Sequence, residues 1–424
     1  MSGNKIKAQF YRQPRYYNSF SCIGGSCPMS CCLMWRVDWT SDEVEKLKNA
    51  DCSEELRTLI DNSFAPSDSD GKKLVIKMDE KKRCPFLTND NFCSIQRELG
   101  AEYLSHTCTV YPRTATLSGN VILNSCNLSC YRIMDILCND SECMILENYR
   151  HTAQNSKIVA IDSDVDIMNH PQLKYRNQIF ELFYDIISDK SYSIETAVVL
   201  GALAAQNLDK NIALGKINSI PEIISGLSKQ IKDPIQIKKL EELKPNYSIK
   251  LGFAKKLNEI VLKTNMIDNI CENGVLSAEK FDDGIRKFNY NFANRSFALR
   301  NIALNLLLEL KIPFRNKDYS IFENYCYYAA AVASVKLTAA AVFVKDNIQE
   351  TMAVAQTYPS AKSASGIKLS VKIKTKKDSE LDFKASSAYI SRFFAHNDSN
   401  VKLILDMYKE LNCMSPAYIA LILK

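Results

Sequence analysis

The run Cys22-Ile-Gly-Gly-Ser-Cys27-Pro-Met-Ser-Cys31-Cys32 brings four cysteines together around two glycines and a proline. Cysteines that only fill a core have no reason to crowd at such intervals, whereas a small loop that aims several sulfurs at one metal does. Twelve of the fifteen cysteines of this 424-residue chain lie in its first 143 residues. The sequence therefore predicts a cysteine-rich metal-binding domain at the N-terminal end.

Three more groups of cysteines follow this loop and extend the candidate ligand set. The nine candidate metal ligands are Cys22, Cys27, Cys31, Cys32, Cys84, Cys93, Cys108, Cys126 and Cys130. One iron–sulfur cluster needs about four thiolates, so either two metal sites exist or several of these thiols are bystanders. Taken singly, any one of them could instead be a small buried hydrophobe. The other six cysteines lack a paired partner, which favours core packing for them.

The choice between zinc and iron–sulfur depends on ligand type and spacing. Zinc sites favour cysteine pairs separated by two residues, often together with histidine. This chain has no such pair, and its four histidines are scattered. Ligation by cysteine alone favours an iron–sulfur cluster, although spacing leaves both metals open. The CX3CX2C triplet that radical S-adenosylmethionine (SAM) enzymes often use is absent, which weighs against radical chemistry.

Composition limits the compartment and the partners. Residues 1–10 contain no apolar run of signal-peptide length, so we expect a cytoplasmic protein whose thiols stay reduced. The most apolar stretch, Ile321–Val344, is interrupted by polar residues and predicts a buried helix rather than a membrane span. No nucleic-acid-binding motif is visible, and the basic residues are not interleaved with aromatic ones. We therefore expect neither a nucleic acid nor a membrane as partner.

Charge is distributed unevenly along the chain. Residues 1–150 carry 18 Lys and Arg against 19 Asp and Glu, a net charge of −1. The remainder carries 36 against 29, a net charge of +7 that completes the total of +6. This surplus could steer an acidic partner toward the C-terminal part, although an ordinary solvated surface would have the same composition.

The pattern along the chain predicts two parts. Residues 1–150 read as an α+β domain of short elements, with a hairpin that turns at residues 118–120. From residue 171 to 424, apolar residues recur at helical spacing, which predicts a mainly α-helical domain. Within it, Ser277–Leu310 reads as one long helix, and residues 357–386 read as a strand or a flap. The glycine-rich fingerprint of Rossmann-type nucleotide-binding folds is missing.

Several motifs of the first 135 residues resemble those of flagellin lysine N-methylases, the FliB family. They are Gln13-Pro-Arg-Tyr-Tyr-Asn-Ser-Phe-Ser-Cys22-Ile-Gly-Gly-Ser-Cys27, Cys31-Cys32 followed by Trp35-Arg36, Cys84-Pro-Phe-Leu, Cys93-Ser-Ile, and Leu104-Ser-His-Thr-Cys108-Thr-Val-Tyr-Pro-Arg113. Some of these elements are also similar to a broader group of zinc- or iron-chelating proteins. The resemblance covers residues 10–135, and no sharp motif extends it into the helical part.

The resemblance implies a SAM-dependent transfer of a methyl group to surface lysine ε-amines of flagellin, and a [4Fe–4S] cluster. With no Rossmann fingerprint, we expect SAM beside the cluster. Arg113 would pair with the SAM carboxylate, and Trp35 would stack on its adenine, with Arg36 as a further binding residue. Tyr111 would accept a hydrogen bond from the substrate lysine. The alternative role for each of these residues is to buttress the cluster.

Polar SN2 transfer is sufficient for this reaction, because a lysine amine is nucleophilic once it is neutral. Three rival functions stay open from the residues alone. The chain could bind or deliver zinc or iron without catalysis, which predicts no affinity for SAM. It could be a redox or radical enzyme, which predicts dependence on a reductant. It could also be an adaptor that holds flagellin without methylating it.

Overall fold

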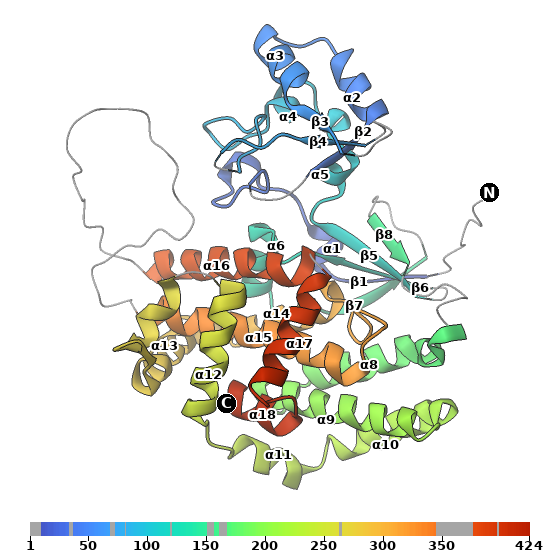
Figure 1. The fold of residues 1–424 in the computed structure, drawn as a ribbon, viewed down its shortest axis with the longest axis vertical. Helices are drawn as coiled ribbons and strands as arrows, with labels where there is room; N and C mark the ends of the chain where they lie inside the picture. Colours follow the sequence, from blue (N-terminus) through green and yellow to red (C-terminus); the bar gives the residue numbers. More distant parts are fainter. Residues whose placement is uncertain are drawn as a thin grey trace.

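The computed structural model describes residues 10–33, 37–67, 73–80, 82–118, 121–150, 157–160, 168–262, 265–344, 376–396 and 398–424. These residues form a small lobe and a larger helical body with a sheet at the junction (Figure 1). The small lobe stands at the top of Figure 1, and the helices of the body stack below it.

The small lobe holds the elements between about residues 38 and 110. Its three-stranded antiparallel sheet has the order β2-β4-β3. Thr40 begins α2 with a complete capping box, because its side chain accepts from the Glu43 N–H and Glu43 accepts from the Thr40 N–H. Its elements are β2 Asp38–Thr40, α2 Ser41–Lys48, α3 Glu54–Asn62, β3 Phe64–Pro66, β4 Lys73–Ile76, α4 Ser94–Glu98 and α5 His106–Val110.

A five-stranded mixed sheet joins the lobe to the body, in the order β7-β1-β6-β5-β8. β5 and β6 pair as the antiparallel hairpin that the sequence predicts, while β1 runs parallel to β6 and β8 parallel to β5. The elements are β1 Phe10–Pro14, α1 Tyr16–Ser19, β5 Arg113–Ser118, β6 Val121–Cys126, α6 Tyr131–Asn139, β7 Leu146–Tyr149 and β8 Lys157–Ala160. Helix α6 packs on the body through α14 and α16.

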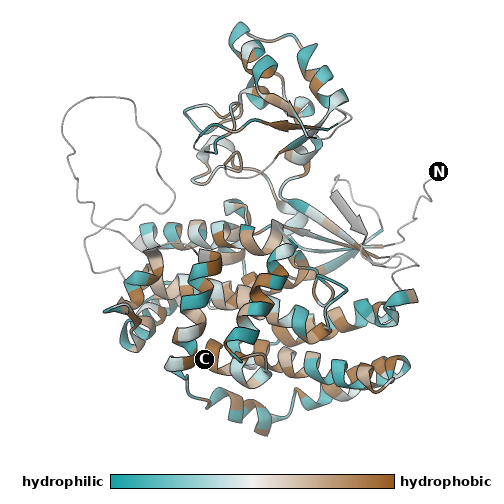
Figure 2. Ribbon diagram, viewed as in Figure 1, coloured by the Kyte–Doolittle hydropathy of each residue, from teal (hydrophilic) through white to brown (hydrophobic). Residues whose placement is uncertain are grey.

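The body is α-helical, as the apolar periodicity predicts. Its helices are α8 Arg176–Ser188, α9 Ile194–Ala213, α10 Ile220–Gln230, α11 Pro234–Glu241, α12 Tyr247–Leu257, α13 Ala278–Asn291, α14 Ala298–Glu309, α15 Ile321–Phe343, α16 Lys376–His396, α17 Ser399–Glu410 and α18 Pro416–Leu423. The short strands β9 Cys271–Glu272 and β10 Val275–Leu276 form a separate hairpin, and a π-helical turn at Asn258–Leu262 follows α12. Figure 2 shows polar and apolar residues on different faces of the peripheral helices, as amphipathic packing requires.

Helix α15 is the centre of the body and packs against α9, α13, α14, α16 and α17. By length and composition it could cross a membrane, but 94% of its most apolar window is buried among the other elements. The expected buried helix is confirmed. Asp209 of α9 also caps its start, because the carboxylate accepts from the Ile321 and Phe322 N–H groups at 3.0 and 2.8 Å.

Two sequence-based expectations for the body are wrong. Ser277–Leu310 is not one helix: α13 ends at Asn291, a 3-10 turn covers Ala293–Arg295, and α14 starts at Ala298. Arg295 in the break forms a bidentate ion pair with Glu380 at 2.7–2.8 Å, so the tertiary contact favours the turn. Residues 376–386 are helical, within α16, where we expected a strand or flap. The rest of that segment lies outside the described residues.

The buried side chains divide between two main cores. The core of the small lobe is formed by residues from Val37 to Ile95. The core of the body also contains residues from the N-terminal part, among them Tyr16, Tyr17, Cys126 and Ile133. By packing, α1, β6 and α6 therefore belong to the helical body, although they lie in the first 150 residues.

Candidate functional site

The loop Cys22–Cys32 folds against the turn at residues 90–92. Gly24 has φ +55°, and a Cβ there would lie 3.0 Å from the Phe92 ring. A Cβ on Gly25 would lie 3.0 Å from the Asp90 carbonyl oxygen. The two glycines therefore allow the loop to pass close enough to bring its thiols to those of the next segment.

Backbone contacts bring the later cysteines to this loop. The Cys84 N–H donates to the Cys32 carbonyl at 2.9 Å, and Cys93 pairs with Leu87 in an isolated antiparallel bridge. Ser105 caps α5, and its hydroxyl accepts from the Cys108 N–H at 3.1 Å. These interactions, all within the first 110 residues, help to place the three thiols.

Eight of the nine candidate thiols line one cavity of about 290 Å³. They are Cys22, Cys27, Cys31, Cys32, Cys84, Cys93, Cys108 and Cys130. The cavity lies between the small lobe and the body, and its lining also includes Phe20, Trp39, Tyr111, Arg113 and Arg132. Among the described residues that line it there is no histidine and no carboxylate. A set of eight thiols suits zinc or an iron–sulfur cluster better than a hard cation.

The ninth candidate, Cys126, is not brought to this cavity. It is the last residue of β6 and is fully buried in the core of the body. Its N–H donates to the Tyr16 hydroxyl at 3.0 Å, and its carbonyl accepts from Asn305 Nδ2 at 3.0 Å. Cys126 therefore serves packing, which was the alternative for single members of the set.

The eight thiols line one cavity, but they are not arranged around a single metal position. All fifteen cysteines lie in the described residues and are thiols. In that part of the chain no three His, Cys, Asp or Glu side chains already surround one metal position. A metal would have to draw neighbouring sulfurs together, which the loops that carry them allow.

The surroundings of Cys32 favour the thiolate form of its side chain. Hydrogen bonds from Cys31 and Cys84, with Arg83 nearby, hold the pKa of the Cys32 thiol well below its usual value. Burial raises the pKa of Cys108 and of Cys130 to about 12. Without a metal, the thiol of Cys32 therefore ionises more readily than the thiols of Cys108 and Cys130. A bound cation would reverse this balance, because it stabilises every thiolate that coordinates it.

Tyr111 lies on the cavity wall, just before a cis peptide bond to Pro112. Its hydroxyl is hydrogen-bonded to the Ser129 hydroxyl at 3.0 Å. Burial raises the pKa of Tyr111 well above its usual value. The phenol is therefore neutral at physiological pH and can act as a hydrogen-bonding group, but not as a phenolate base.

Arg113 is held by aromatic residues at the edge of the cavity. Its guanidinium lies 4.9 Å from the centre of the Phe20 ring, and Nη2 donates to the Phe20 carbonyl at 3.0 Å. Its Nε is buried and has no hydrogen-bond partner in the described residues. Arg113 thus presents a fixed, incompletely satisfied cation to the cavity, as binding of a carboxylate requires.

The other two predicted binding residues, Trp35 and Arg36, lie outside the described residues. Trp39 lines the cavity, with an exposed fraction of 2%. Sequence reasoning missed two arginines at the site. Arg132 lines the cavity two residues after Cys130, and Arg392 of α16 donates to the Leu33 carbonyl at 2.9 Å. Proximity to Cys130 could have indicated Arg132, but nothing in the sequence connects Arg392 to the cysteines.

A polar face of α14 holds the segment that carries Cys130. Asn301, Asn305 and Glu309 are spaced four residues apart, so they share one face of the helix. Asn301 donates to the carbonyls of residues 137 and 140 at 3.0 and 2.8 Å. Asn305 donates to the Cys126 carbonyl, and Glu309 accepts from the Leu128 N–H at 3.0 Å. The body therefore fixes the loop between β6 and α6.

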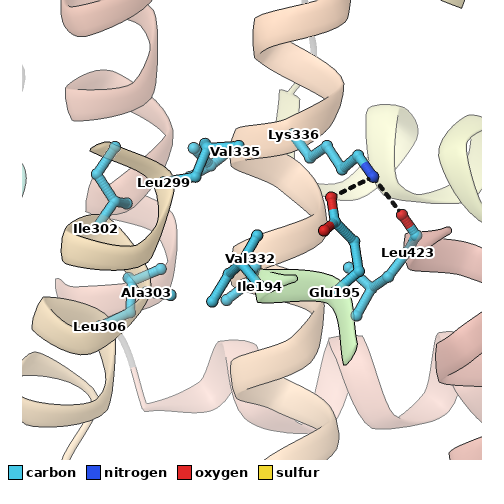
Figure 3. Close-up of a pocket in the computed structure, with 10 residues that line it drawn as sticks. All are labelled: Ile194, Glu195, Leu299, Ile302, Ala303, Leu306, Val332, Val335, Lys336 and Leu423. Carbon is cyan, nitrogen blue, oxygen red and sulfur yellow. Dashed lines mark hydrogen bonds and ion pairs between the residues drawn. The ribbon is translucent and has the colours of Figure 1, made fainter. Parts of the chain in front are cut away.

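A second cavity, in the body, is too small to be a substrate site (Figure 3). It measures about 10 Å³, enough for one water molecule. Lys336 crosses its edge and bonds to Glu195 at 2.6 Å and to the Leu423 carbonyl. Its polar groups satisfy one another, and the cysteine cavity stays the candidate site.

Comparison with known proteins agrees with the sequence motifs. The model of the FliB lysine N-methylase C-terminal domain matches residues 181–362. The lysine-N-methylase of Salmonella typhimurium strain LT2 is 23% identical over 365 residues, which cover 80% of this chain and 87% of that protein. The flagellar biosynthetic protein FliU of Salmonella muenchen is 31% identical over 147 residues, which cover 34% of this chain and 86% of FliU. No solved structure matches this chain.

Proposed function

The chain belongs to the FliB family of lysine N-methylases, and on this premise we propose that it is a SAM-dependent protein-lysine N-methyltransferase acting on flagellin. The names of its relatives support a methyltransferase. The main structural support for such a site is the cavity of about 290 Å³ between the lobe and the body, with Arg113 and Tyr111 on its wall. Its volume lies at the lower end of the range for small-molecule pockets.

The reaction we propose is a direct displacement. The neutral ε-amine of a flagellin lysine attacks the methyl carbon of SAM, a nitrogen–carbon bond forms, and the carbon–sulfur bond breaks. The electron pair of that bond stays on sulfur, which leaves as the neutral thioether S-adenosylhomocysteine. The amine releases one proton to solvent. This displacement needs no external electron donor.

The residues of the cavity would support three parts of this reaction. Arg113 would bind the SAM carboxylate through its guanidinium. Apolar groups such as Phe20 and Trp39 would exclude water and lower the pKa of the incoming lysine, because burial disfavours the ammonium form. Tyr111 would accept or donate a hydrogen bond at the amine without becoming charged. Trp35 and Arg36 stay proposed contributors to SAM binding.

We also propose a [4Fe–4S] cluster held by thiols of this cavity. The donor set is suitable, because eight thiols line the cavity and thiolates are the usual ligands of iron–sulfur clusters. When bound, the cluster would supply a positively charged anchor for thiolates that tie the lobe to the body. Arg113 and Arg132 border the same space, where they would balance the negative charge of thiolate ligands.

Flagellin is proposed as the substrate from two observations. FliU carries the name flagellar biosynthetic protein, and the first relative is named lysine-N-methylase. Residues 151–424 of this chain carry the net charge of +7 counted above, which would attract an acidic protein at long range.

The decisive experiment uses the full chain, purified without oxygen and incubated with methyl-labelled SAM and flagellin. We expect label on flagellin lysines, with no reductant required and no 5′-deoxyadenosine formed. Absence of both SAM binding and label transfer would overturn the proposal and leave a metal-binding protein. Flagellin binding without label transfer would identify an adaptor, and dependence on a reductant would identify a radical enzyme.

Arg113→Met should weaken SAM binding. The lost charge-assisted hydrogen bonds are worth about 1.5–3 kcal/mol, so the Kd for SAM should rise roughly tenfold to a hundredfold. Arg97→Met is the matched control, because Arg97 also stacks on an aromatic ring, at 5.2 Å from Phe92, but does not line the cavity. Titration calorimetry on both variants makes the test. An unchanged Kd for Arg113→Met would exclude Arg113 as the carboxylate ligand.

Tyr111→Phe should have a small effect on methyl transfer. The substitution removes one neutral hydrogen bond, worth about 1 kcal/mol, so kcat should fall roughly fivefold. The measurement is the rate of label transfer at saturating SAM and flagellin. A fall of more than about a hundredfold, the loss typical of a missing general base, would show that the phenol takes the proton in spite of its burial.

A further inference from the structure

One buried lysine of the helical body lacks a polar partner. Lys250 of α12 has an exposed fraction of 2%. Its Nζ is buried and has neither a hydrogen bond nor an ion pair in the part of the chain that the structure describes. An ammonium group that is removed from water and left unpaired costs free energy. Either the Lys250 amine is neutral, or a counter-ion from solution accompanies it.

Aromatic rings around Lys250 favour the charged form of the amine. Nζ lies 4.3 Å from the centre of the Phe281 ring and 5.4 Å from the centre of the Tyr247 ring. The faces of such rings attract an ammonium group. Burial acts in the opposite direction and, with a smaller contribution from Lys336, lowers the pKa of Lys250 to about 7. A nearby negative charge would therefore decide in favour of the ammonium form.

Two carboxylates lie within electrostatic range of Lys250, and both have other partners. Asp282 of α13 is exposed and accepts from the Tyr247 hydroxyl. Glu195 of α9 bonds to Lys336 at 2.6 Å. Lys336 thus has its counter-charge, whereas Lys250 does not. The described groups leave one positive charge uncompensated at this place in the body.

Lys250 lines a small cavity enclosed by α12, α13, α15 and α18. The cavity measures about 10 Å³, room for one occupant of about the size of a water molecule. It shares Lys336 and Leu423 with the neighbouring cavity of Figure 3. Apart from its two lysines, the described residues that line it have aromatic or aliphatic side chains. Their side chains therefore offer donors but no acceptor.

This lining suits an anion better than a water molecule. A buried water usually makes roughly two to four hydrogen bonds, as donor and as acceptor. Here it could accept from Lys250, but the lining side chains would accept nothing from it, and the Leu423 carbonyl already accepts from Lys336. An anion needs only donors, and it supplies the charge that Lys250 lacks. The small volume favours a single-atom ion over phosphate or sulfate.

We propose that this cavity is a binding site for one halide ion, chloride in the cell, with the Lys250 ammonium as its principal ligand. Lys336 adds a second positive charge on the cavity wall, beyond its pair with Glu195. The ion would compensate the buried charge of α12 where that helix meets the central helix α15. It would thereby stabilise the folded body, independently of any methyl transfer at the cysteine cavity.

The test measures urea unfolding of the full chain, purified without oxygen, in sodium chloride and in sodium gluconate of equal ionic strength. Gluconate is too large for the cavity. The pH should be about 6, where the Lys250 ammonium predominates. For a Kd of about 10 mM, about 200 mM chloride should raise the folding equilibrium constant roughly twentyfold relative to gluconate. Bromide should have a similar effect.

Lys250→Met keeps the length of the side chain and removes the ammonium, so it should abolish the difference between the two salts. Lys255→Met, at an exposed position of the same helix, should keep the full difference. Salts also act on the whole protein surface, but that general effect is the same in all three proteins. An equal chloride effect in wild type and Lys250→Met, or none in the wild type, would overturn the proposal.

A second measurement needs no variant and covers the case in which Lys250→Met does not fold. Crystals of the wild-type protein soaked in bromide should show anomalous scattering from one ion beside Lys250 Nζ, within the cavity. Absence of a bromide peak there would contradict the proposal. Neither measurement uses methyl transfer as its readout, so the two proposals fail or stand separately.

Discussion

Gly284→Ala should destabilise the protein by about 2–3 kcal/mol, although alanine is the better helix former. Gly284 lies in α13, where a Cβ would be 2.1 Å from the Ala340 carbonyl oxygen and 2.8 Å from its carbonyl carbon in α15. Those are backbone atoms of a buried helix, so they cannot turn aside as a flexible side chain would. The two helices would have to separate, and the gain of about 1 kcal/mol in helix propensity is smaller than the cost of that movement.

Gly226→Ala in α10 is the matched control for this substitution. No heavy atom lies within 4 Å of the position that its Cβ would take. It should therefore stabilise the protein by about 0.5–1 kcal/mol, through propensity alone. Urea denaturation of both variants measures the two changes. If both shift the midpoint in the same direction, α13 and α15 do not approach as closely as the structure has them.

The close approach of α13 and α15 also shows what the sequence could not reveal. Apolar periodicity predicts both helices, because each presents an apolar face every three to four residues. It says nothing about which pairs of helices touch backbone to backbone. It also failed at the break between α13 and α14, where Arg295 turns to Glu380, a residue 85 positions away.

The strand pairing was predictable only in part. The hairpin β5–β6 follows from a local turn, and its register joins Ser118 to Val121. The parallel pairing of β1 with β6 joins Phe10 to Val121, across more than a hundred residues. No local pattern near Phe10 identifies such a distant partner.

The candidate site shows the same limit. Short motifs predict the eight thiols that line the cavity, because glycine turns and capping residues affect only the few residues next to them. Cys126 does not line the cavity with the other candidates, since a CX3C spacing does not show that one residue ends a strand and is buried in the core. Arg392 and the polar face of α14 reach the site from the helical body. Only the fold brings them there, so no motif could contain them.

Glu309 should make the stability of the protein depend strongly on pH. The carboxyl is buried in the core of the body, where Oε2 accepts the Leu128 N–H and Oε1 has no partner in the described residues. Burial raises the pKa of Glu309 to about 8, compared with about 4.3 in an unfolded chain. The folded state therefore keeps a proton that the unfolded state releases. Stability is fully present below the unfolded pKa and is lost as pH rises through the folded pKa.

Between these two pKa values the loss should be about 1.4 kcal/mol per pH unit. Glu309→Gln keeps an acceptor for the Leu128 N–H but cannot ionise, so it should remove this contribution. The difference in unfolding free energy between variant and wild type should move by about 2.7 kcal/mol in favour of the variant from pH 5.5 to 7.5. Urea denaturation at the two pH values measures it, with Glu45→Gln, at an exposed position of α2, as the control.

If the unfolding free energies of wild type and Glu309→Gln change equally between the two pH values, the Glu309 carboxyl is ionised at both and the body accommodates its charge. The expected divergence has a consequence for the site. Glu309 reaches the loop between β6 and α6, and Cys130 follows Leu128 by two residues in that loop. Ionisation of a buried carboxyl at this point favours opening of the loop toward water. The hold of the body on the segment that carries Cys130 should therefore weaken as pH rises toward 8.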